Sequence, residues 1–595
     1  MKLVLRPAVL ACLVFAFASA CAASRPDVVV MLADDAGWGD YSASGNRMVR
    51  TPQIDSLARD GVSFDRFFVC PLCAPTRAEF LTGRCYLRTG VLGVSTGHER
   101  LNADEHTIAD AFRAAGYATG AFGKWHNGSQ WPYHPCARGF DEYYGYTAGH
   151  WGEYFDPPLE RNGKMERAKG YIVDVCTDEA INFIERNRDR PFFCYVPFTT
   201  PHSPWAVPQE YWQRFKDKPL EQHATQPERE ILDQTRCALA MLENQDWNVG
   251  RILKKLDDLK LADNTIVLYF SDNGPNGARW TGGMKGVKGG TDEGSVRSVC
   301  FLRWPASLPK GKTVSEIAGA IDLLPTLTAL AGVEPVGDKP LDGRDLMPLL
   351  LGRKAGWPER ALYAAWGGKV SARTQQYRLD AAGALFDMST DSGQAHNIAA
   401  DRPDVAARLA RAAAAWRQEM YGPDEEIKLE KGGRVDPRKL GVGYPEFPVT
   451  MLPARDGEPR GCVTRSGRAP NCSYFVNWVD KTGEMVWEID VRTGGEYDVT
   501  VDYTCPLSDA GSLVELSFNG SRLTGRVMPG WDPPLLTNQD TIPRGHGESQ
   551  MKDFRTLALG TIRLEKGAGP LALRALEIPG ASVMDVRRVA LTLKR

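Results

Sequence analysis

The stretch Cys73-Ala74-Pro75-Thr76-Arg77 places a thiol and a guanidinium four residues apart at the start of a predicted helix. Pro75 suits the first turn of a helix, and residues 78–81 continue it. Cys73 would then lie at a helix N-terminus, where exposed backbone N–H groups favour an anion. A cysteine in this position is as often packed or disulfide-bonded, so the stretch alone leaves catalytic and structural roles open.

Two acidic turns follow two strand-like apolar runs. Residues 27–32 lead into Asp34-Asp35, and residues 265–270 lead into Asp272-Asn273. Because open α/β sheets place their sites beyond the carboxyl ends of strands, we expect the two turns to converge. Three carboxylates and an amide oxygen form a hard ligand set that favours calcium or magnesium over zinc. Each turn alone is more often an ordinary turn or a helix cap than a metal site.

Lysines and histidines follow further predicted strands. Residues 118–122 and 191–198 read as strands, and a glycine-rich stretch covers residues 285–294. The side chains that follow or lie in these segments are Lys124, His126, His202 and Lys288. A single histidine at a strand end is more often structural than catalytic, and a single lysine is usually solvated. These four residues become candidate site residues only in combination with the other motifs.

Taken together and in this order, the blocks resemble the signature of the formylglycine-dependent (type I) sulfatases of the alkaline-phosphatase-like superfamily. The resemblance rests on the Cys73 stretch followed by Leu-Thr-Gly-Arg, the acidic turns, Gly-Lys-Trp-His-Asn-Gly at 123–128 and the lysine- and glycine-rich 285–294. It covers about residues 27–420. The departures are Thr76, where Ser is commoner, Asn127 in place of Leu and Ser295 in place of Gly.

The resemblance implies a set of site residues. Cys73 would be oxidised to formylglycine by a formylglycine-generating enzyme, and one Ca²⁺ would contact the resulting group. The implied metal ligands are Asp34, Asp35, Cys73, Asp272 and Asn273. The implied catalytic residues are Cys73, Arg77, Lys124, His126, His202 and Lys288.

The same resemblance implies a mechanism. A hydroxyl of the hydrated aldehyde, acidified by Ca²⁺, would attack sulfur while Arg77 holds the diol and Asp35. Lys124 and Lys288 would neutralise charge on the sulfuryl oxygens. His202, together with Lys288, would protonate the leaving alcohol, and His126 would take the proton of the second hydroxyl to expel sulfate.

The fold class expected is α/β, with an alkaline-phosphatase-like central mixed sheet flanked by helices, a small α+β subdomain and an appended antiparallel β-sandwich. After about residue 420 the sequence becomes rich in Pro, Gly and charged residues. Beyond this stretch, runs in which apolar and polar residues alternate recur between Gly-rich turns. The expected segments are a signal peptide at 1–23, a catalytic domain at 26–355, the subdomain at 356–422, a linker at 423–448 and the sandwich at 449–595. The sandwich resembles carbohydrate-binding modules, although a purely packing role is equally compatible with it.

Charge and the N-terminal segment bear on partners and location. The chain of 595 residues has 72 Lys plus Arg against 74 Asp plus Glu, which gives no electrostatic case for nucleic acid. The apolar run after Arg6 reads as a signal peptide and is too short to span a membrane. We therefore expect a periplasmic or extracellular protein without an integral span, and Cys21 is a candidate for lipid attachment. Disulfides would suit this location, with Cys462 and Cys472 as the best local pair.

The substrate expected from the resemblance is a sulfated carbohydrate or another organic sulfate. The tryptophans near the motifs are candidate stacking surfaces for sugar rings or, equally, core residues: Trp125, Trp151, Trp205 and Trp280. Two rival functions remain. One is a phosphomonoester or phosphonate hydrolase of the same superfamily, and the other is a non-catalytic glycan-binding protein in which Cys73 stays unconverted.

Overall fold

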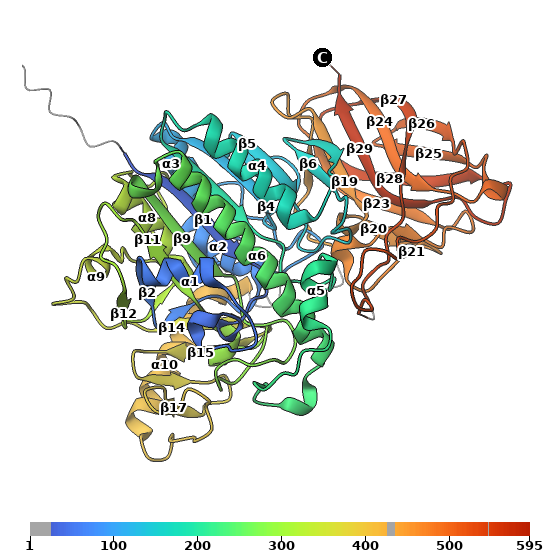
Figure 1. Ribbon diagram of the computed structural model, residues 1–595. Helices are drawn as coiled ribbons and strands as arrows, with labels where there is room; N and C mark the ends of the chain where they lie inside the picture. Colours follow the sequence, from blue (N-terminus) through green and yellow to red (C-terminus); the bar gives the residue numbers. More distant parts are fainter. Residues whose placement is uncertain (1–24, 425–434, 546, 595) are drawn as a thin grey trace, which may run out of the picture.

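The computed structural model describes residues 25–424, 435–545 and 547–594 (Figure 1). The expected signal peptide and the candidate lipidation residue Cys21 lie outside these residues. A main domain built on a large sheet carries a small subdomain on one side and a β-sandwich on another. This confirms the predicted α/β class with an added sandwich.

The main domain is organised by a ten-stranded mixed sheet. Its centre is parallel, because β1 pairs with β8 and β9 and β4 pairs with β8 and β5 in the same direction, whereas β11 and β6 run antiparallel to their neighbours. In spatial order the strands are β12 (Lys312–Val314), β2 (Val62–Phe64), β11 (Cys300–Arg303), β9 (Thr265–Ser271), β1 (Asp27–Ala33), β8 (Phe192–Pro197), β4 (Ala118–Lys124), β5 (Glu142–Tyr146), β6 (Pro158–Arg161) and β7 (Lys164–Arg167).

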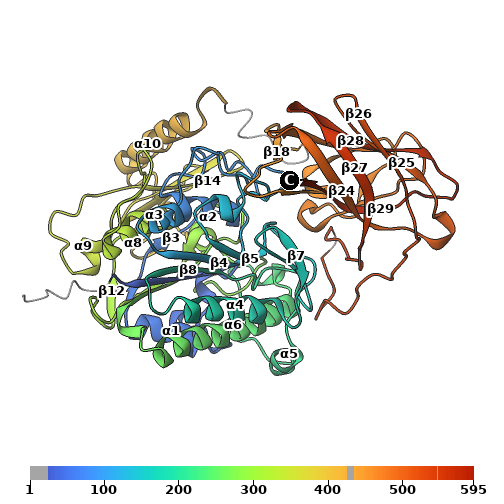
Figure 2. The same ribbon diagram turned by 90° about the horizontal axis from the view of Figure 1, so that it is seen from above.

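Strand β1 is buried on both faces, which explains its continuous apolar sequence. Its alternate residues feed two separate cores: Val28, Val30 and Leu32 pack on one face, and Val29 and Met31 pack on the other. Helices cover both faces (Figure 2). The first core contacts α2 (Cys73–Thr82), α3 (Ile108–Ala114) and α8 (Leu323–Ala331), and the second contacts α1 (Pro52–Arg59), α4 (Ile172–Arg186) and α6 (Leu232–Asp258).

Smaller elements complete the main domain and form the small subdomain. Strands β10 (Arg297–Ser298), β3 (Phe67–Phe68) and β13 (Ala318–Gly319) make a three-stranded sheet, and the short helices are α5 (Gln209–Phe215), α7 (Glu293–Val296) and α9 (Met347–Leu350). The small subdomain is an antiparallel sheet with one long helix: β14 (Leu362–Trp366), β15 (Lys369–Arg373), β16 (Tyr377–Leu379), β17 (Leu385–Asp387) and α10 (Pro403–Tyr421).

The sandwich has two six-stranded sheets around one core of buried aliphatic and aromatic side chains. One sheet contains β18 (Leu440–Val442), β20 (Glu458–Arg460), β23 (Glu484–Val491), β25 (Leu513–Phe518), β26 (Ser521–Arg526) and β28 (Gly567–Glu577). The other contains β19 (Val449–Pro453), β21 (Thr464–Arg465), β22 (Phe475–Val476), β24 (Gly495–Thr504), β27 (Arg555–Leu564) and β29 (Asp585–Leu593). Strand β18 lies within the segment expected to be a linker, and it pairs with β23 in parallel.

The state of the cysteines differs from the expectation that they form disulfides. All eleven cysteines in the described residues are free. Cys472 packs with Tyr474 and Met551, whereas Cys462 packs against the sandwich core, so the two cysteines of the expected local pair belong to different clusters. The prediction of a Cys462–Cys472 disulfide is therefore wrong.

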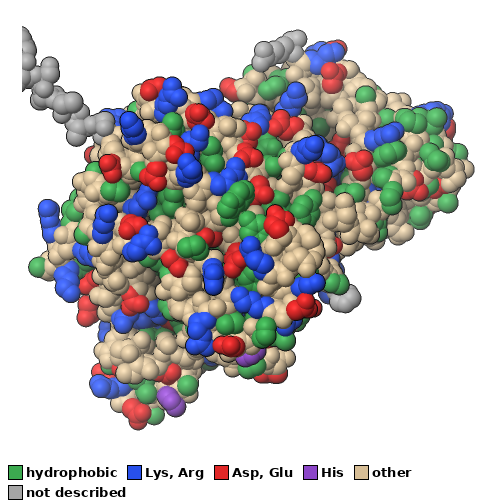
Figure 3. All heavy atoms as spheres, in the orientation of Figure 1, with side chains coloured by type: hydrophobic (Ala, Val, Ile, Leu, Met, Phe, Trp, Pro, Cys, Tyr) green, Lys and Arg blue, Asp and Glu red, His purple; other side chains and the backbone are tan. Residues whose placement is uncertain are grey.

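The distribution of charge on the surface and the character of the helices agree with the sequence analysis. Positive and negative side chains are interspersed over the face shown in Figure 3, as expected from nearly balanced charge. Among the helices of the described residues, none combines the length and the apolar character needed to cross a membrane.

A buried carboxylate joins the small subdomain to the main domain. Glu293 lies in the glycine-rich motif at the start of α7 and is fully buried. Its Oε2 lies 3.0 Å from Arg378 Nη1 and 3.2 Å from Arg373 Nε, both on the subdomain sheet. Burial opposes ionisation, but Arg373 and Arg378 outweigh it and lower the pKa of Glu293. The motif glutamate thus holds two domains together.

We predict that Glu293→Gln lowers the free energy of unfolding by about 3–5 kcal/mol, because it leaves buried arginines without their counter-charge. Since the folded-state pKa of Glu293 is depressed, its stabilisation is present above the unfolded glutamate pKa of about 4.3 and is lost as pH falls through the lower folded value. Urea unfolding of wild type and variant at neutral pH and near pH 3 measures this. The exposed Glu228→Gln serves as the control and should change stability by less than about 0.5 kcal/mol.

Candidate functional site

The parallel strands bring the acidic turns together at their carboxyl ends. Ala33 of β1 is in register with Ser271 of β9, so the residues that follow each strand are neighbours. The backbone N–H of Asp35 donates to Asp272 Oδ1 at 3.1 Å. Asn273 Nδ2 donates to Asp35 Oδ1 at 2.9 Å. The convergence expected from the sequence is therefore present, and all four side chains are buried.

Cys73 is the first residue of α2 and is 3% exposed. Its Sγ lies with carboxylate oxygens of Asp34 and Asp272 in one group whose atoms are within 4.8 Å of one another. One helical turn later, Arg77 Nη2 donates to Asp272 Oδ2 at 2.8 Å and lies 3.7 Å from Asp34 Oδ1. Arg77 was expected to hold Asp35, and the structure places it against these two other carboxylates.

Two lysines neutralise the remaining carboxylate charge. Lys124, the last residue of β4, places its Nζ 2.7 Å from Asp34 Oδ2. Lys288, in the glycine-rich stretch, places its Nζ 2.6 Å from Asp35 Oδ1. With Arg77, three cations face three carboxylates, and all of these side chains are buried except that of Lys288, which is partly exposed. Buried charges are stable only when paired.

The two histidines are held by backbone carbonyls through different nitrogens. His126 Nε2 lies 2.8 Å from Val94 O, and its buried Nδ1 has no hydrogen-bond partner. His202 Nδ1 lies 2.6 Å from Ser203 O, and its Nε2 lies 3.6 Å from Asp35 Oδ2. Since a carbonyl only accepts, His126 donates through Nε2 and His202 donates through Nδ1. The other nitrogen of each ring is the one that can exchange a proton.

Backbone strain accompanies the site. Asp35 and His126 have φ values of 68° and 66°, in the left-handed region that non-glycine residues seldom adopt. Gly149 packs against the His126 ring so closely that a Cβ there would lie 2.0 Å from Nε2. Such conformations persist where the surrounding structure fixes them, and they cluster at functional sites.

Burial and charge set the protonation of the cluster. Burial raises the pKa of the Cys73 thiol, which keeps it protonated near neutral pH, and burial beside Asp34 raises the pKa of Asp272. Burial would raise the pKa of Asp35 as well, but the positive charge of Lys288 holds it well below the usual range. Burial also lowers the pKa of His202 to about 3 and that of His126 well below its usual value.

The oxygens of this group fit a divalent cation. Asp34 Oδ1, Asp35 Oδ2 and Asn273 Oδ1 are buried and accept no hydrogen bond. Buried polar atoms are normally satisfied, so three unsatisfied oxygens in one cluster indicate a missing positive partner. Hard oxygen donors of this kind suit Ca²⁺ or Mg²⁺. The residues present fit the metal implied by the sequence motifs.

The candidate stacking tryptophans divide into two pairs. Trp125 and Trp205 are buried in the cores, so they are packing residues. Trp151 and Trp280 are partly exposed. Trp151 stacks on Tyr146 with ring centroids 5.2 Å apart and lies under the guanidinium of Arg587 from the sandwich. It therefore belongs to the interface between the main domain and the sandwich.

Three further residues near the site were not found from the sequence. His150 packs edge-to-face on His202 with ring centroids 5.1 Å apart. Glu548 and Asn471 reach the site region from the sandwich and contact Ser203 and Val94. Ser203 and Glu548 are separated by 345 positions in the chain. No local sequence signal identifies contacts of this kind.

The chain is similar to known sulfatases. A family model described as Sulfatase matches residues 26–333. N-acetylgalactosamine-6-sulfatase of Sus scrofa is 32% identical over 387 residues, covering 59% of this chain and 70% of the relative. Steryl-sulfatase of Mus musculus is 31% identical over 425 residues, covering 55% of this chain and 65% of that protein.

Solved structures give the same fold. The structure of Ps i-CgsB in complex with k-i-k-neocarrahexaose matches with a TM-score of 0.60 and 28% identity, covering 68% of this chain and 97% of that one. The phosphonate monoester hydrolase of Agrobacterium radiobacter matches with a TM-score of 0.52 and 23% identity, a likeness of fold alone.

The family match spans more than half of the chain, from before the first acidic turn to beyond the second. It includes every candidate site residue of the main domain. The chain belongs to the sulfatase family and is a sulfatase enzyme of alkaline-phosphatase-like fold.

Proposed function

We propose that this enzyme removes sulfate from a sulfated carbohydrate, using formylglycine formed from Cys73 and one calcium ion. The observation that carries the proposal is the buried group of Asp34, Cys73 and Asp272, with unsatisfied oxygens of Asp34, Asp35 and Asn273 around it. A formylglycine-generating enzyme would act on the chain during maturation. The proposed location is periplasmic or extracellular, in keeping with the N-terminal sequence.

The chemistry of Cys73 supports its conversion. A thiol is a soft ligand among hard oxygens, and burial raises the pKa of Cys73, so the reactive thiolate is scarce at neutral pH. An oxygen function at this position would match both the metal and the reaction. The hydrated aldehyde supplies the nucleophilic oxygen, and calcium supplies Lewis-acid activation and charge neutralisation when bound.

The cations of the site would stabilise the anionic ester. Lys124 and Lys288 are buried or nearly so, and they point at the carboxylates beside Cys73. Arg77 fixes Asp272 and donates through Nη1 to Lys124 O at 3.0 Å, which holds the end of β4 in place. Preorganised cations in a water-poor site commonly supply the largest part of the rate enhancement.

The two histidines would carry out different proton transfers. His126 is neutral with a free Nδ1, which suits a base that accepts a proton from the group at position 73. His202 exchanges protons through Nε2, which faces the site beside Asp35. The negative charge of a bound ester favours the protonated imidazole, so His202 suits the donor to the leaving alcohol.

The relatives support the proposed substrate class. N-acetylgalactosamine-6-sulfatase and the structure bound to k-i-k-neocarrahexaose both concern carbohydrates, whereas steryl-sulfatase concerns a sterol. Release of sulfate from a panel of sulfated hexosamines and galactans, with the matching phosphate esters in parallel, tests the proposal. Turnover of phosphate esters alone would reject it in favour of the phosphatase alternative.

We predict that calcium raises the melting temperature of the purified protein and that Asp272→Asn abolishes this shift. A ligand at 100 times its Kd stabilises the folded state by about 2.7 kcal/mol, and removing one carboxylate removes a principal ligand. Thermal melts with and without calcium, together with metal analysis, measure the effect. The exposed Asp263→Asn is the control and should keep the full shift. An unchanged shift in Asp272→Asn would contradict the assigned ligand.

We predict that Cys73→Ser folds but does not turn over. Serine has one hydroxyl where the hydrated aldehyde has two, so His126 finds no second proton to remove and product release stops after one event at most. A burst assay for sulfate-ester cleavage and the mass of the peptide carrying residue 73 test this. Cys136→Ser, at a partly exposed cysteine away from the cluster, should retain activity. Full activity of a wild-type preparation whose thiol is wholly unmodified would refute the role of formylglycine.

A further inference from the structure

The sandwich sends a long segment onto the main domain. Between β26 and β27, residues 527–545 and 547–554 include side chains and backbone groups that contact the regions following β5 and β8. Gln539 Oε1 accepts from the backbone N–H of Tyr154 and of Phe155, both at 2.9 Å. The backbone N–H of Thr541 donates to Trp205 O at 2.8 Å. These bonds fix the segment against the loop that carries His202.

Glu548, in this segment, contacts two residues that adjoin His202. Its Oε1 accepts a hydrogen bond from Ser203 Oγ at 2.7 Å. Its Oε2 lies 3.6 Å from His150 Nε2. His150 packs on the His202 ring, and Ser203 O accepts from His202 Nδ1. The carboxylate therefore touches both structures that set the position of the His202 ring.

The contact between Glu548 and His150 is specific. Glu548 Oε2 and His150 Nε2 are both buried, and neither has a hydrogen-bond partner elsewhere. The two atoms lie 3.6 Å apart, slightly beyond hydrogen-bond distance, so they form a close buried polar contact without a direct hydrogen bond. This pairing ties the sandwich to the second histidine of the site.

A separate part of the sandwich reaches the first histidine. Asn471 Nδ2 donates to Val94 O at 3.0 Å, and His126 Nε2 donates to the same carbonyl at 2.8 Å. The segment around Asn471 lies between β21 and β22, far along the chain from Glu548. The sandwich therefore supports the immediate surroundings of both proton-transfer residues.

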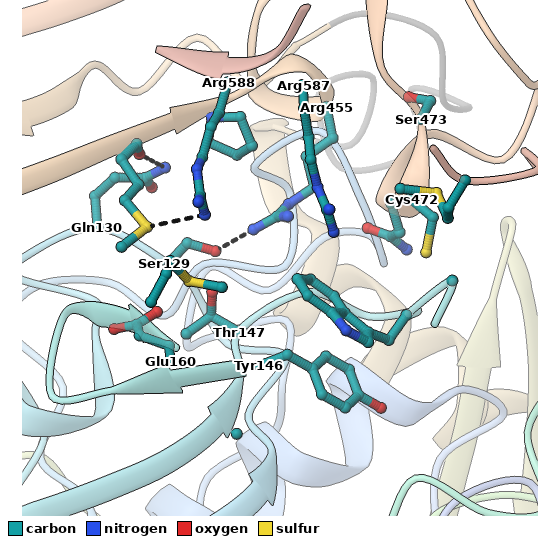
Figure 4. A pocket seen from close by; sticks show the side chains of 18 of the residues that line it. Ser129, Gln130, Tyr146, Thr147, Glu160, Arg455, Cys472, Ser473, Arg587 and Arg588 are labelled. Carbon is teal, nitrogen blue, oxygen red and sulfur yellow. Dashed lines mark hydrogen bonds between the residues drawn. The ribbon is translucent and has the colours of Figure 1, made fainter. Parts of the chain in front are cut away.

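The remaining interface joins the domains firmly. Arg587 forms two hydrogen bonds to the buried Glu153, at 3.1 and 3.0 Å, and Arg455 bonds Ser129. Figure 4 shows Arg455, Arg587 and Arg588 pointing from the sandwich toward Ser129 and Tyr146. These residues line a cavity whose volume is about 60 Å³. Arg588 is itself paired with Asp502. Arg455 and Arg587 therefore bond across the interface, whereas the partner of Arg588 lies within the sandwich.

The exposed face of the sandwich offers little for sugar stacking. Of its three tryptophans, Trp478 and Trp487 are core residues, and the partly exposed Trp531 has the guanidinium of Arg555 over its ring. In the described part of the sandwich no aromatic side chain is largely exposed. Sugar-binding sites usually present aromatic rings to their ligand. The contacts with the main domain are the better guide to what the sandwich does.

We propose that Glu548 is a positioning residue for His202, and that the sandwich thereby forms part of the catalytic centre. The inference rests on the proposed function, in which His202 protonates the leaving alcohol. A general acid contributes about 10²–10⁴-fold, and most to a leaving group that is a poor one without protonation. An alkyl alcohol of a sugar needs the proton, whereas a nitrophenolate departs without it.

The test is the ratio of kcat on two substrates. We measure N-acetylgalactosamine 6-O-sulfate against p-nitrophenyl sulfate for wild type, Glu548→Ala and His202→Ala. We expect Glu548→Ala to lower kcat on the sugar sulfate about tenfold or more, and to lower kcat on the aryl sulfate less than about threefold. We expect His202→Ala also to lower kcat more on the sugar sulfate than on the aryl sulfate, with a larger difference between the two. A general loss of folded enzyme lowers both rates equally and leaves the ratio unchanged.

The control is Asp553→Asn, at an exposed ion pair that the same segment makes with Arg167 of the main domain. It should leave both rates and their ratio unchanged. A ratio unchanged in Glu548→Ala would overturn the proposal. If the wild-type enzyme releases sulfate from neither substrate, the proposed function fails first, and the two failures are thereby distinguished.

Discussion

The carboxylates that converge beyond β1 and β9 are the constraint on which the rest of the structure depends. Asp34, Asp35 and Asp272 are withdrawn from water within a few ångströms of one another. Mutual repulsion and desolvation would neutralise them unless positive charge were fixed nearby. Arg77, Lys124 and Lys288 supply it from α2, β4 and the glycine-rich loop. A divalent cation would satisfy the oxygens that these side chains leave unused.

The main part of the fold was predictable because its signals are local. Strand β1 and the acidic turn that follows it are adjacent in the sequence, and parallel sheets bring such turns together by a general rule. The start of α2 at Cys73 follows from Pro75 in its first turn. These signals fix residue types and element ends, and they are sufficient to place the acidic residues and Cys73 in one site.

Contacts between remote segments were not predictable. The sequence indicated a sandwich from period-two alternation, but alternation says which face of a strand is buried and nothing about what the connecting loops touch. No sequence signal therefore marked the carboxylate of Glu548, and Arg77, expected to hold Asp35, lies against Asp272 and Asp34. Trp125 and Trp205 show the same limit, since proximity to a motif in sequence does not separate a core aromatic from a substrate platform.

The division of labour between the two histidines follows from where backbone carbonyls lie. His126 is tied through Nε2 to Val94, and His202 is tied through Nδ1 to Ser203, so the rings present opposite nitrogens to the site. One ring therefore offers a free acceptor, and the other offers a nitrogen beside Asp35 that a proton can occupy. Asn471 and Glu548 contact the residues that make these two ties, so in the proposed mechanism the sandwich influences the proton transfers through ring orientation. A domain that reads as an appendage in the sequence is in this way coupled to the geometry of the site.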